Sequence, residues 1–334
     1  MRAAVFSEFG EPARVLSVRE VEPPRPGRGE VRIRMLASPI NPSDLMTVRG
    51  VYGQKPKLPA VPGYEGVGIV EESNGGLLGR FLKGKRVAVL NKSGGNWSEQ
   101  VVIPAKQAIP LPADLPLEQA ASFFVNPATA WVMTREVLRV PNNDWLLQTA
   151  AGSALGRMVI RLGRKEGFRT LNVVRRAEQA DELKRLGADA TIVFDPAHHP
   201  QELLRQLVTE ATAGQGVRYA IDPVGGATAS AIIPCLRDEG RLLFFGSLSD
   251  DPVVFAQRHL MSTGARLEGF WLSRHMNTLG LVGKLRLVGK LKSLIRSGVL
   301  ATDTGEAFPL EQVTSAVAAA EQAGRSGKVL LRMT

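Results

Sequence analysis

Cysteine is almost absent from this 334-residue chain, in which Cys235 is the only one. A disulfide within the chain needs two thiols and a cysteine-based zinc site needs several, so both are excluded. The segment around this cysteine, residues 232–236, is otherwise apolar (IIPCL). This pattern predicts that the thiol is a buried packing group.

Long apolar runs are also missing, although 44% of the residues are hydrophobic. No run approaches the roughly 20 residues that a membrane-spanning helix requires. The first residues, Met1–Phe6, begin a strand-like pattern and lack the architecture of a signal peptide. We therefore expect a globular protein that does not enter the membrane and is located in the cytoplasm.

Acidic residues are fewer than basic ones, 32 against 42, which gives a formal net charge of +10. Such a charge attracts polyanions, and one alternative is a non-catalytic nucleotide-binding or RNA-associated protein. The lysines and arginines are scattered, however, and do not form one stripe with aromatic residues. A cofactor and a substrate that carry phosphates account for the charge equally well. We expect no specific nucleic-acid partner.

The pattern of expected secondary structure changes near residue 127. Residues 1–126 contain short alternating segments separated by Pro- and Gly-rich turns, which predict a β-rich domain. Over 127–273, six expected strands alternate with helices, a pattern typical of a doubly wound parallel sheet. The tail, 274–334, carries a long helix with apolar residues at helical spacing and ends in a strand at 328–332.

A strand, a turn of small residues and a helix follow one another from Trp145. The G-x-G-x-x-G pattern of dinucleotide-binding turns is present as Ala151–Gly156, where only the last glycine remains. The next expected strand ends at Arg175 and Arg176. An acid there favours the 2′-hydroxyl of NAD, whereas an arginine accommodates the 2′-phosphate of NADP. We expect NADPH as the cofactor; a solvated strand end is the alternative.

The order of the three parts resembles the medium-chain dehydrogenase/reductase superfamily over nearly the whole chain. Gly63–Gly68 (GYEGVG) is similar to the family's Gly-His-Glu-x-x-Gly motif, whose histidine often binds catalytic zinc. Tyr64 occupies that place here, and Asn41 stands where zinc-dependent members usually have cysteine. Neither residue supplies the anionic sulfur or imidazole that zinc chemistry needs, so the resemblance implies a zinc-free member.

This resemblance also implies the fold class and the domain bounds. We expect an α/β protein with a GroES-like β-rich catalytic domain, 1–126 and 274–334, and a Rossmann domain with a doubly wound parallel sheet, 127–273. Members of the superfamily commonly pair through edge strands of the nucleotide-binding sheet, which implies a homodimer.

Several collinear motifs resemble one branch, the trans-2-enoyl-thioester reductases of fatty acid synthesis. The matching segments are Asn41–Asp44, Arg49–Gly53, Leu58–Gly66, Gly95–Ser98, Val125–Ala130, Thr170–Arg175 and Gly269–Ser273. The implied activity is reduction of the conjugated double bond of enoyl-CoA or enoyl-acyl-carrier thioesters. A quinone or general enone reductase on the same scaffold is the alternative, because both reactions add hydride to a conjugated carbonyl compound.

Reduction of a 2-enoyl thioester places negative charge on the thioester oxygen, which a fixed hydrogen-bond donor stabilises. A tyrosine can donate this bond and act as a proton source without a metal. By resemblance the role falls on Tyr52, one of three tyrosines in the chain. The structural alternative is a loop tyrosine packed beneath the sheet.

The same resemblance implies a set of cofactor contacts beyond the two arginines. The pyrophosphate would lie against Gly152, Ser153, Ala154 and Leu155, and the nicotinamide side would involve Asn126, Phe270, Trp271, Leu272 and Ser273. Phe245 and Gly246 would end a strand beside the cofactor, and Lys328 would approach the cofactor from the C-terminal strand. Three of these residues are equally compatible with a purely structural role. Phe245 could belong to the core, Lys328 could be a solvated edge-strand charge, and Asn126 could be a turn cap before Pro127.

Two positions depart from the branch. Relatives often carry an acid and then an arginine after the residue equivalent to Arg175, whereas this chain has Arg176 and Ala177. Relatives also tend to carry a second aromatic residue shortly after the Phe-Trp-Leu-Ser segment, where this chain has Arg274 and His275. We expect His275 to be an exposed residue at a helix start, with a role in shaping the acyl pocket as the alternative.

Overall fold

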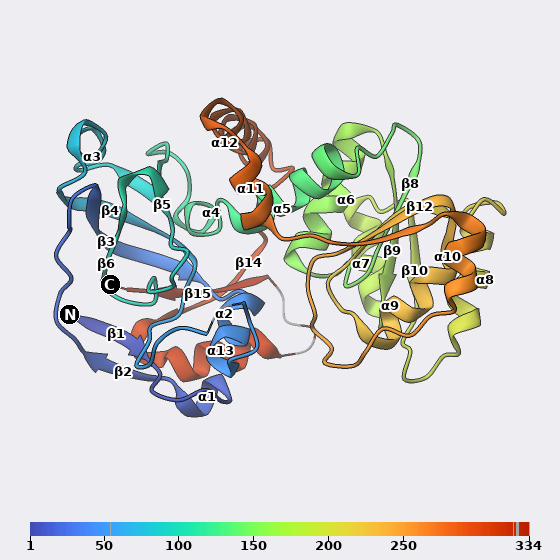
Figure 1. Ribbon diagram of the computed structural model, residues 1–334, viewed down its shortest axis with the longest axis horizontal. Coiled ribbons are helices and arrows are strands. Elements are labelled where there is room, and N and C mark those ends of the chain that lie inside the picture. The colour runs from blue at the N-terminus through green and yellow to red at the C-terminus, as the bar shows by residue number, and fades with distance from the viewer. Residues whose placement is uncertain (54, 323, 325–326, 334) are drawn as a thin grey trace. The chain divides into compact units, whose positions relative to one another are not determined.

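The computed structural model describes residues 1–53, 55–322, 324 and 327–333 (Figure 1). Contacts between residues divide the chain into two compact units. The first comprises Met1–Val125 and Thr302–Thr334, and the second comprises Asn126–Ala301. No described helix combines the length and the apolar composition that crossing a membrane requires.

The first unit is built on a seven-stranded sheet in the order β14-β15-β3-β4-β5-β7, with β6 paired to β3. A two-stranded sheet joins β1 and β2. Side chains of β3 alternate between buried and partly exposed, as expected for a strand with one face on the core. The strands are β1 (Arg2–Val5), β2 (Ser17–Glu20), β3 (Glu30–Pro39), β4 (Glu65–Ser73), β5 (Arg86–Leu90), β6 (Gln100–Pro104), β7 (Ala108–Pro110), β14 (Thr304–Pro309) and β15 (Lys328–Arg332).

Short helices surround this sheet and close its core. They are α1 (Pro12–Val15), α2 (Pro42–Arg49), α3 (Gly76–Leu82), α4 (Leu117–Ala121), α13 (Val313–Glu321) and the 3-10 turns η1 (Ala105–Gln107) and η4 (Leu310–Gln312). Phe6, Met35 and Trp97 are fully buried in the core of this unit. The helix α13 contributes Ala316 and Val317 to the same core.

The second unit contains a six-stranded parallel sheet in the order β10-β9-β8-β11-β12-β13. The order reverses between β8 and β11, which is the arrangement of dinucleotide-binding folds. The strands are β8 (Trp145–Gln148), β9 (Arg169–Val174), β10 (Ala190–Val193), β11 (Val217–Asp222), β12 (Leu236–Phe244) and β13 (Arg266–Gly269).

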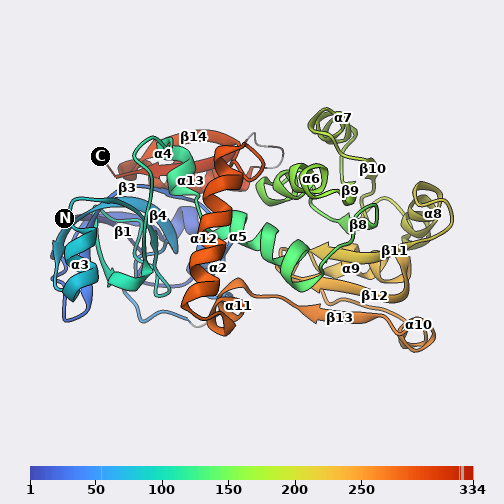
Figure 2. The same cartoon turned by 90° about the horizontal axis from the view of Figure 1, so that it is seen from above.

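Helices connect these strands and pack on both faces of the sheet (Figure 2). Neighbouring residues of β9 point to opposite faces: Val173 packs with Leu204 and Val208 of α8, and Val174 packs with Ile160 of α6 and Leu183 of α7. The helices are α5 (Val125–Trp131), α6 (Ala154–Glu166), α7 (Ala177–Leu186), α8 (Gln201–Ala211), α9 (Gly226–Ile232), α10 (Gln257–Thr263), α11 (Leu272–Thr278), α12 (Leu281–Arg296), the π-helix η2 (Val132–Val137) and the 3-10 turn η3 (Ile233–Cys235).

The architecture confirms the expected fold class, a GroES-like β-rich domain and a Rossmann domain with a parallel sheet. The single thiol, Cys235, is buried as expected. Residues 274–301 group with the second unit, whereas the expected domain bounds placed them in the first. Contacts within the second unit explain the difference, because Lys290 of α12 lies over the ring of Trp131, with its Nζ 4.6 Å from the centroid, and Arg161 donates to the carbonyl of Val299.

Candidate active site

The turn between β8 and α6 has the geometry of a phosphate-binding helix start. Ser153 is the N-cap of α6, and its Oγ accepts a hydrogen bond from the N–H of Gly156 at 3.1 Å. The N–H groups of Ala154 and Leu155, at the first two helical positions, have no acceptor within the helix. Such a helix start attracts anions. The predicted pyrophosphate contacts of Ser153, Ala154 and Leu155 therefore fit the local structure.

Two glycines at this turn lie so close to neighbouring atoms that a side chain there would collide with them. A Cβ on Gly156 would lie 2.4 Å from the carbonyl oxygen of Ala151, so only glycine fits where the helix meets the turn. A Cβ on Gly152 would lie 2.9 Å from Nε2 of Gln179. Gly156 thus keeps the packing role of the third glycine of the dinucleotide pattern, although the first two positions have changed.

Arg175 and Arg176 lie at the end of β9, next to the start of α7. Both side chains are exposed, and Arg176 is the N-cap residue of α7. In the described part of the chain neither guanidinium has a hydrogen bond or an ion pair to a carboxylate. Two cations without an ion-paired acid suit a 2′-phosphate better than a free 2′-hydroxyl. The geometry fits the predicted cofactor.

The other predicted residues of the second unit follow the C-terminal ends of neighbouring strands. Phe245 and Gly246 come directly after β12, and a Cβ on Gly246 would lie 2.7 Å from the carbonyl oxygen of Pro223. Phe270 follows β13, and its N–H donates to the carbonyl of Phe244 at 2.7 Å. Carboxyl ends of parallel strands form the ligand edge of such sheets. Phe245 is half-buried, so it is not a fully enclosed core residue.

The residues after Phe270 begin the short helix α11. Trp271 is its N-cap and is 39% exposed, Leu272 is half-buried and Ser273 is exposed. The guanidinium of Arg274 lies 5.8 Å from the centre of the Trp271 ring. This segment therefore presents aromatic and hydroxyl side chains near the ligand edge of the sheet.

Asn126 is the second residue of α5, since the helix begins at Val125. It is half-buried, and Pro127 is enclosed. The alternative role, a turn cap before Pro127, does not hold because the residue lies inside the first helical turn. Its amide stays a predicted nicotinamide contact.

A buried polar pair at the reversal point of the sheet was missed by the sequence analysis. Thr149, directly after β8, donates its hydroxyl hydrogen to Oδ1 of Asp222 at the end of β11. The other carboxylate oxygen accepts the N–H of Gly225 at 2.7 Å. Burial raises the pKa of Asp222. The pair joins the ends of two strands that are far apart in the sequence, so no local pattern reveals it.

In the first unit, Tyr52 lies in the loop after α2. Gly50 ends that helix with a φ of 76°, and a Cβ there would come within 2.9 Å of the Phe9 ring. The rings of Tyr52 and Tyr64 lie 5.7 Å apart at an angle of 52°. This tilted contact holds the loop tyrosine against a second aromatic residue.

Tyr64 has a different environment from Tyr52. Its hydroxyl is 2.7 Å from Oγ1 of Thr47, which donates to the carbonyl of Ser43. Its backbone N–H donates to Oδ1 of Asp44 at 3.1 Å. Burial raises the pKa of Tyr64, so the phenol stays protonated. Its hydroxyl is thus engaged within the protein.

Three charged groups are buried together behind these tyrosines: Asp44, Glu65 and Lys328. Asp44 accepts the backbone N–H of Asn41 at 2.8 Å. Burial raises the pKa of Asp44 to about 7, against the attraction of the nearby Lys328 ammonium. Burial also raises the pKa of Glu65, whose Oε1 accepts the N–H groups of Phe124 (2.6 Å) and Val125 (2.7 Å) at the start of α5.

This cluster revises one interpretation of Lys328. The residue is only 3% exposed, and β15 lies between β14 and β3, so Lys328 is not a solvated edge-strand charge. Its ammonium lies in the field of two carboxylates of the same unit. Its contact with the cofactor stays a prediction.

Asn41 and Tyr64 stand at the two positions where the family resemblance places zinc ligands in zinc-dependent members. Within the described residues there is no group of three or more His, Cys, Asp or Glu side chains that could hold a metal ion. Zinc independence stays a prediction, and metal analysis of the purified protein tests it.

His275 differs from the expected exposed residue. It is half-buried, its Nε2 lies 3.0 Å from Oε2 of Glu136 and its ring centre is 6.4 Å from that of Phe270. Oε1 of Glu136 accepts the indole N–H of Trp131 at 3.1 Å. His275 therefore helps to fix α11 against η2.

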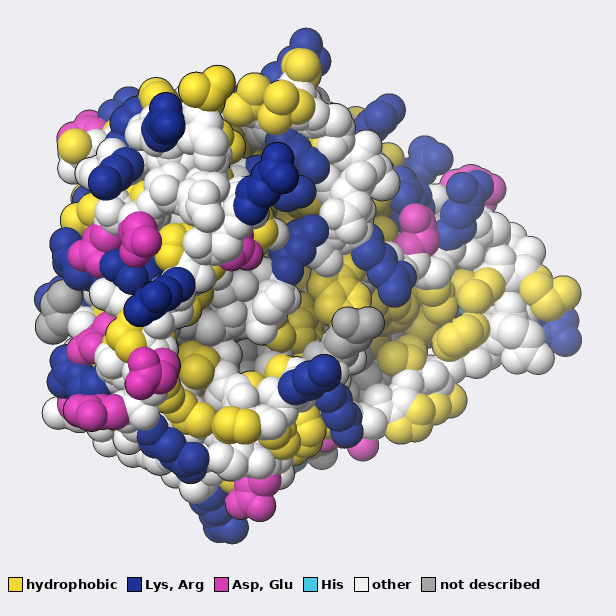
Figure 3. Space-filling model, turned by 60° about the vertical axis from the view of Figure 1, so that its left-hand side comes forward, with side chains coloured by type: hydrophobic (Ala, Val, Ile, Leu, Met, Phe, Trp, Pro, Cys, Tyr) yellow, Lys and Arg dark blue, Asp and Glu magenta, His cyan; other side chains and the backbone are white. Residues whose placement is uncertain are grey.

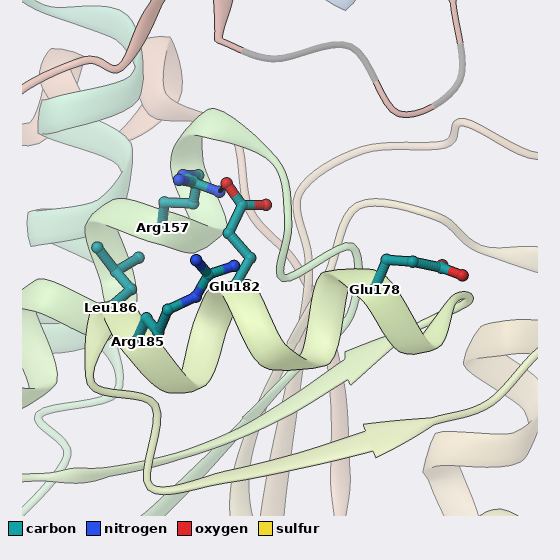
Figure 4. Close-up of a pocket in the computed structure, with 5 residues that line it drawn as sticks. All are labelled: Arg157, Glu178, Glu182, Arg185 and Leu186. Atoms are coloured by element: carbon teal, nitrogen blue, oxygen red, sulfur yellow. Dashed lines mark ion pairs between the residues drawn. The ribbon is translucent and has the colours of Figure 1, made fainter.

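A hollow of about 440 Å³ lies between α6 and α7 (Figure 4). Arg157 of α6 and Glu178, Glu182, Arg185 and Leu186 of α7 line it. Arg157 forms an ion pair with Glu182 at 2.8 Å. None of the predicted cofactor residues lines this hollow, and its two carboxylates disfavour a phosphate.

Known proteins resemble this chain along its whole length. Family models for the alcohol dehydrogenase GroES-like domain and for zinc-binding dehydrogenase match residues 27–113 and 154–284. The mitochondrial enoyl-[acyl-carrier-protein] reductase of Bos taurus is 32% identical over 337 residues, covering 100% of this chain and 89% of the relative. The protein of the same name from Arabidopsis thaliana is 32% identical, covering 93% and 82%.

Solved structures agree with these relatives in fold. Quinone oxidoreductase of Escherichia coli, complexed with NADPH, has a TM-score of 0.90 and 26% identity, covering 99% of this chain and 100% of that chain. A mycobacterial protein complexed with NADPH has a TM-score of 0.88 and 27% identity, with the same coverage. The shared domains and the relatives that match from end to end lead to one conclusion: the chain belongs to the medium-chain dehydrogenase/reductase superfamily.

Proposed function

We propose that this protein is an NADPH-dependent reductase of the conjugated double bond in 2-enoyl thioesters. The observation that carries the proposal is the placement of Tyr52, held by Gly50 and the Tyr64 ring, in a chain whose relatives are named enoyl-[acyl-carrier-protein] reductases. The protein is an oxidoreductase of a superfamily whose neighbours hold NADPH.

The cofactor assignment rests on residues of the second unit. Ala154 and Leu155 offer N–H groups to the pyrophosphate, and Gly156 lets α6 approach the turn closely. Arg175 and Arg176 supply two cations for the 2′-phosphate, without a competing carboxylate in the described structure. When bound, NADPH supplies the hydride that adds to the β-carbon.

Tyr52 acts on the thioester in this mechanism. Its hydroxyl donates a hydrogen bond to the thioester oxygen, on which negative charge develops, and serves as the proton source for the α-carbon. Tyr64 supports the Tyr52 ring, while its own hydroxyl stays bonded to Thr47. The two tyrosines therefore have separable roles.

A pair of conservative variants tests this assignment. Tyr52→Phe should lower turnover of crotonyl-CoA by about 10²–10⁴-fold, the usual contribution of an acid–base group, and leave NADPH affinity nearly unchanged. Tyr64→Phe keeps the supporting ring and should cost much less. Steady-state kinetics and NADPH titration give both numbers. Activity of Tyr52→Phe within about threefold of the parent would remove Tyr52 from the mechanism.

A quinone or general enone reductase is the second candidate, and the likeness to Escherichia coli quinone oxidoreductase supports it. Initial rates with a series of enoyl-CoAs and simple quinones, each with NADPH and NADH, separate the two. Activity confined to quinones would refute the enoyl-thioester proposal.

We also propose a homodimer located in the cytoplasm. β10 and β13 are the two outer strands of the six-stranded sheet, so each has an edge available for pairing with a second copy, and we propose β13 as the pairing strand. Light scattering of the purified protein tests the dimer, and a monomer at micromolar concentration would refute it.

A further inference from the structure

One helix of the second unit gathers positive charge without any acidic residue. Between Glu268 and Asp303 the chain contains no Asp or Glu, although it has 32 acidic residues in total. The basic residues in this stretch are Arg274, Lys284, Arg286, Lys290, Lys292 and Arg296. Five of these six belong to α12. This helix therefore carries five positive charges and no negative one.

The helix presents two different faces. Leu287, Leu291, Leu294 and Ile295 are buried, as their helical spacing requires. On the opposite side, Leu281, Val282 and Leu285 of the first turns are 74%, 61% and 62% exposed.

Arg286 and Lys290 are exposed and continue this outer side by one turn each. We call these five residues, Leu281, Val282, Leu285, Arg286 and Lys290, the α12 surface. Basic and apolar side chains lie together in the upper part of the face drawn in Figure 3.

Few carboxylates of the protein itself compensate this surface. In the described structure no acidic side chain forms an ion pair with Arg286 or Lys290, and Lys290 contacts the ring of Trp131. Exposed apolar side chains bordered by uncompensated charge are typical of interaction sites. The positive charge of the α12 surface then determines which kind of partner can bind there.

A second copy of the chain and a lipid bilayer both fit the α12 surface poorly. A second copy of the chain would bring the same cations face to face, which repels. A bilayer needs a continuous apolar face, whereas most apolar residues of α12 are buried and only three at its start are exposed. An acidic protein segment with a few apolar contacts complements both parts of the surface.

We propose that the α12 surface docks the acidic helix of an acyl-carrier protein that delivers the enoyl thioester. This inference rests on the proposed function. The helix α11, about 10 Å long, separates α12 from Phe270 and Trp271 at the ligand edge of the sheet. A carrier docked on α12 thus lies near the segment predicted to face the nicotinamide.

The test compares three forms of the same crotonyl thioester: on acyl-carrier protein, on CoA and on N-acetylcysteamine, which has neither protein nor phosphate. The double variant Arg286→Glu/Lys290→Glu should lower kcat/KM for the carrier-protein substrate by about tenfold or more at low salt. The rate with the N-acetylcysteamine thioester should stay unchanged. The parent's preference for the carrier protein should also weaken as salt rises.

A matched control changes the same number of charges elsewhere. Arg80 and Lys83 are exposed on and directly after α3 of the first unit, and Arg80→Glu/Lys83→Glu should leave all three substrates unaffected. Direct binding of the carrier protein, measured by fluorescence anisotropy without turnover, completes the set. Only the α12 variant should lose this binding.

Several results would overturn the proposal. An equal loss with CoA would assign the surface to the phosphates of CoA, and an equal loss with all three substrates would indicate damage to the site. Binding to anionic phosphatidylserine vesicles that disappears in the α12 variant, without carrier-protein binding, would indicate a membrane surface. If the parent reduces no enoyl thioester, the proposed function fails; carrier-protein binding by anisotropy then still decides whether the surface docks this partner.

Discussion

At the scale of single residues, we attribute the choice of cofactor to two side chains at the end of β9. Arg175 and Arg176 are exposed, and no carboxylate of the described structure neutralises them. Hydrogen bonds to charged groups contribute about 1.5–3 kcal/mol each. A phosphate held by these guanidinium groups would therefore favour NADPH strongly over NADH.

We expect Arg175→Ala to raise the KM for NADPH by roughly 10- to 100-fold and to leave the KM for NADH nearly unchanged. The reason is that only NADPH carries the 2′-phosphate. Arg176→Ala, measured in the same way, determines whether the second arginine completes the site. Lys184→Ala, an exposed lysine on α7, is the control. A parent enzyme that prefers NADH would contradict the assignment outright.

Single residues also show where the sequence stops being informative. The place of the two arginines at a strand end was predictable from the spacing after the turn, and their contact with the 2′-phosphate stays a prediction. The burial of Lys328 could not be predicted from the sequence. It depends on Asp44 and Glu65, which are distant in the sequence and come close only in the folded unit. The His275–Glu136 pair was missed for the same reason.

At the scale of elements, the turn between β8 and α6 has one strict packing requirement. A methyl group on Gly156 would lie 2.4 Å from the carbonyl oxygen of Ala151 and 2.7 Å from its Cα. Backbone atoms cannot move aside as a flexible side chain can. The turn and the start of α6 would have to separate, and the N–H groups proposed to bind the pyrophosphate would move with them.

Gly156→Ala should thus destabilise the protein by about 1–3 kcal/mol and weaken NADPH binding. The control is Gly289→Ala on α12, where an added Cβ meets no atom within 4 Å. This substitution should stabilise the protein by about 0.5–1 kcal/mol, because alanine favours a helix over glycine. Urea denaturation and NADPH titration measure the two effects. Unchanged stability and affinity in Gly156→Ala would show that the turn relaxes freely.

Elements were the level at which the sequence was most informative. The helix expected after the turn of small residues and the closing strand expected at 328–332 agree with α6 and β15, because apolar periodicity and terminal glycines are local properties. The assignment of residues 274–301 to the second unit could not be predicted from local sequence. It depends on α12 packing near Trp131 and on Arg161 reaching the carbonyl of Val299.

At the scale of the whole molecule, the buried cluster of the first unit couples stability to pH. Burial raises the pKa of Asp44 from 3.8 to about 7 and that of Glu65 in the same direction. The folded state then binds more protons than the unfolded state between about pH 4 and 7. Stability should fall as pH rises through this window, and the contribution of Asp44 should level off above about pH 7.

The variant Asp44→Asn should remove much of this dependence. For Asp44 alone, the rise from 3.8 to about 7 corresponds to roughly 4 kcal/mol of unfolding free energy across the window. Chemical denaturation at pH 4.5, 6, 7.5 and 9 should show a parent whose stability declines up to about pH 7 and a variant with a flatter profile. Glu22→Gln, at an exposed position of the same unit, should keep the parent's profile. If Asp44→Asn retains the full slope, the carboxylate is already ionised at pH 4.5 in the folded protein, and Lys328 then stabilises its charge more strongly than burial opposes it.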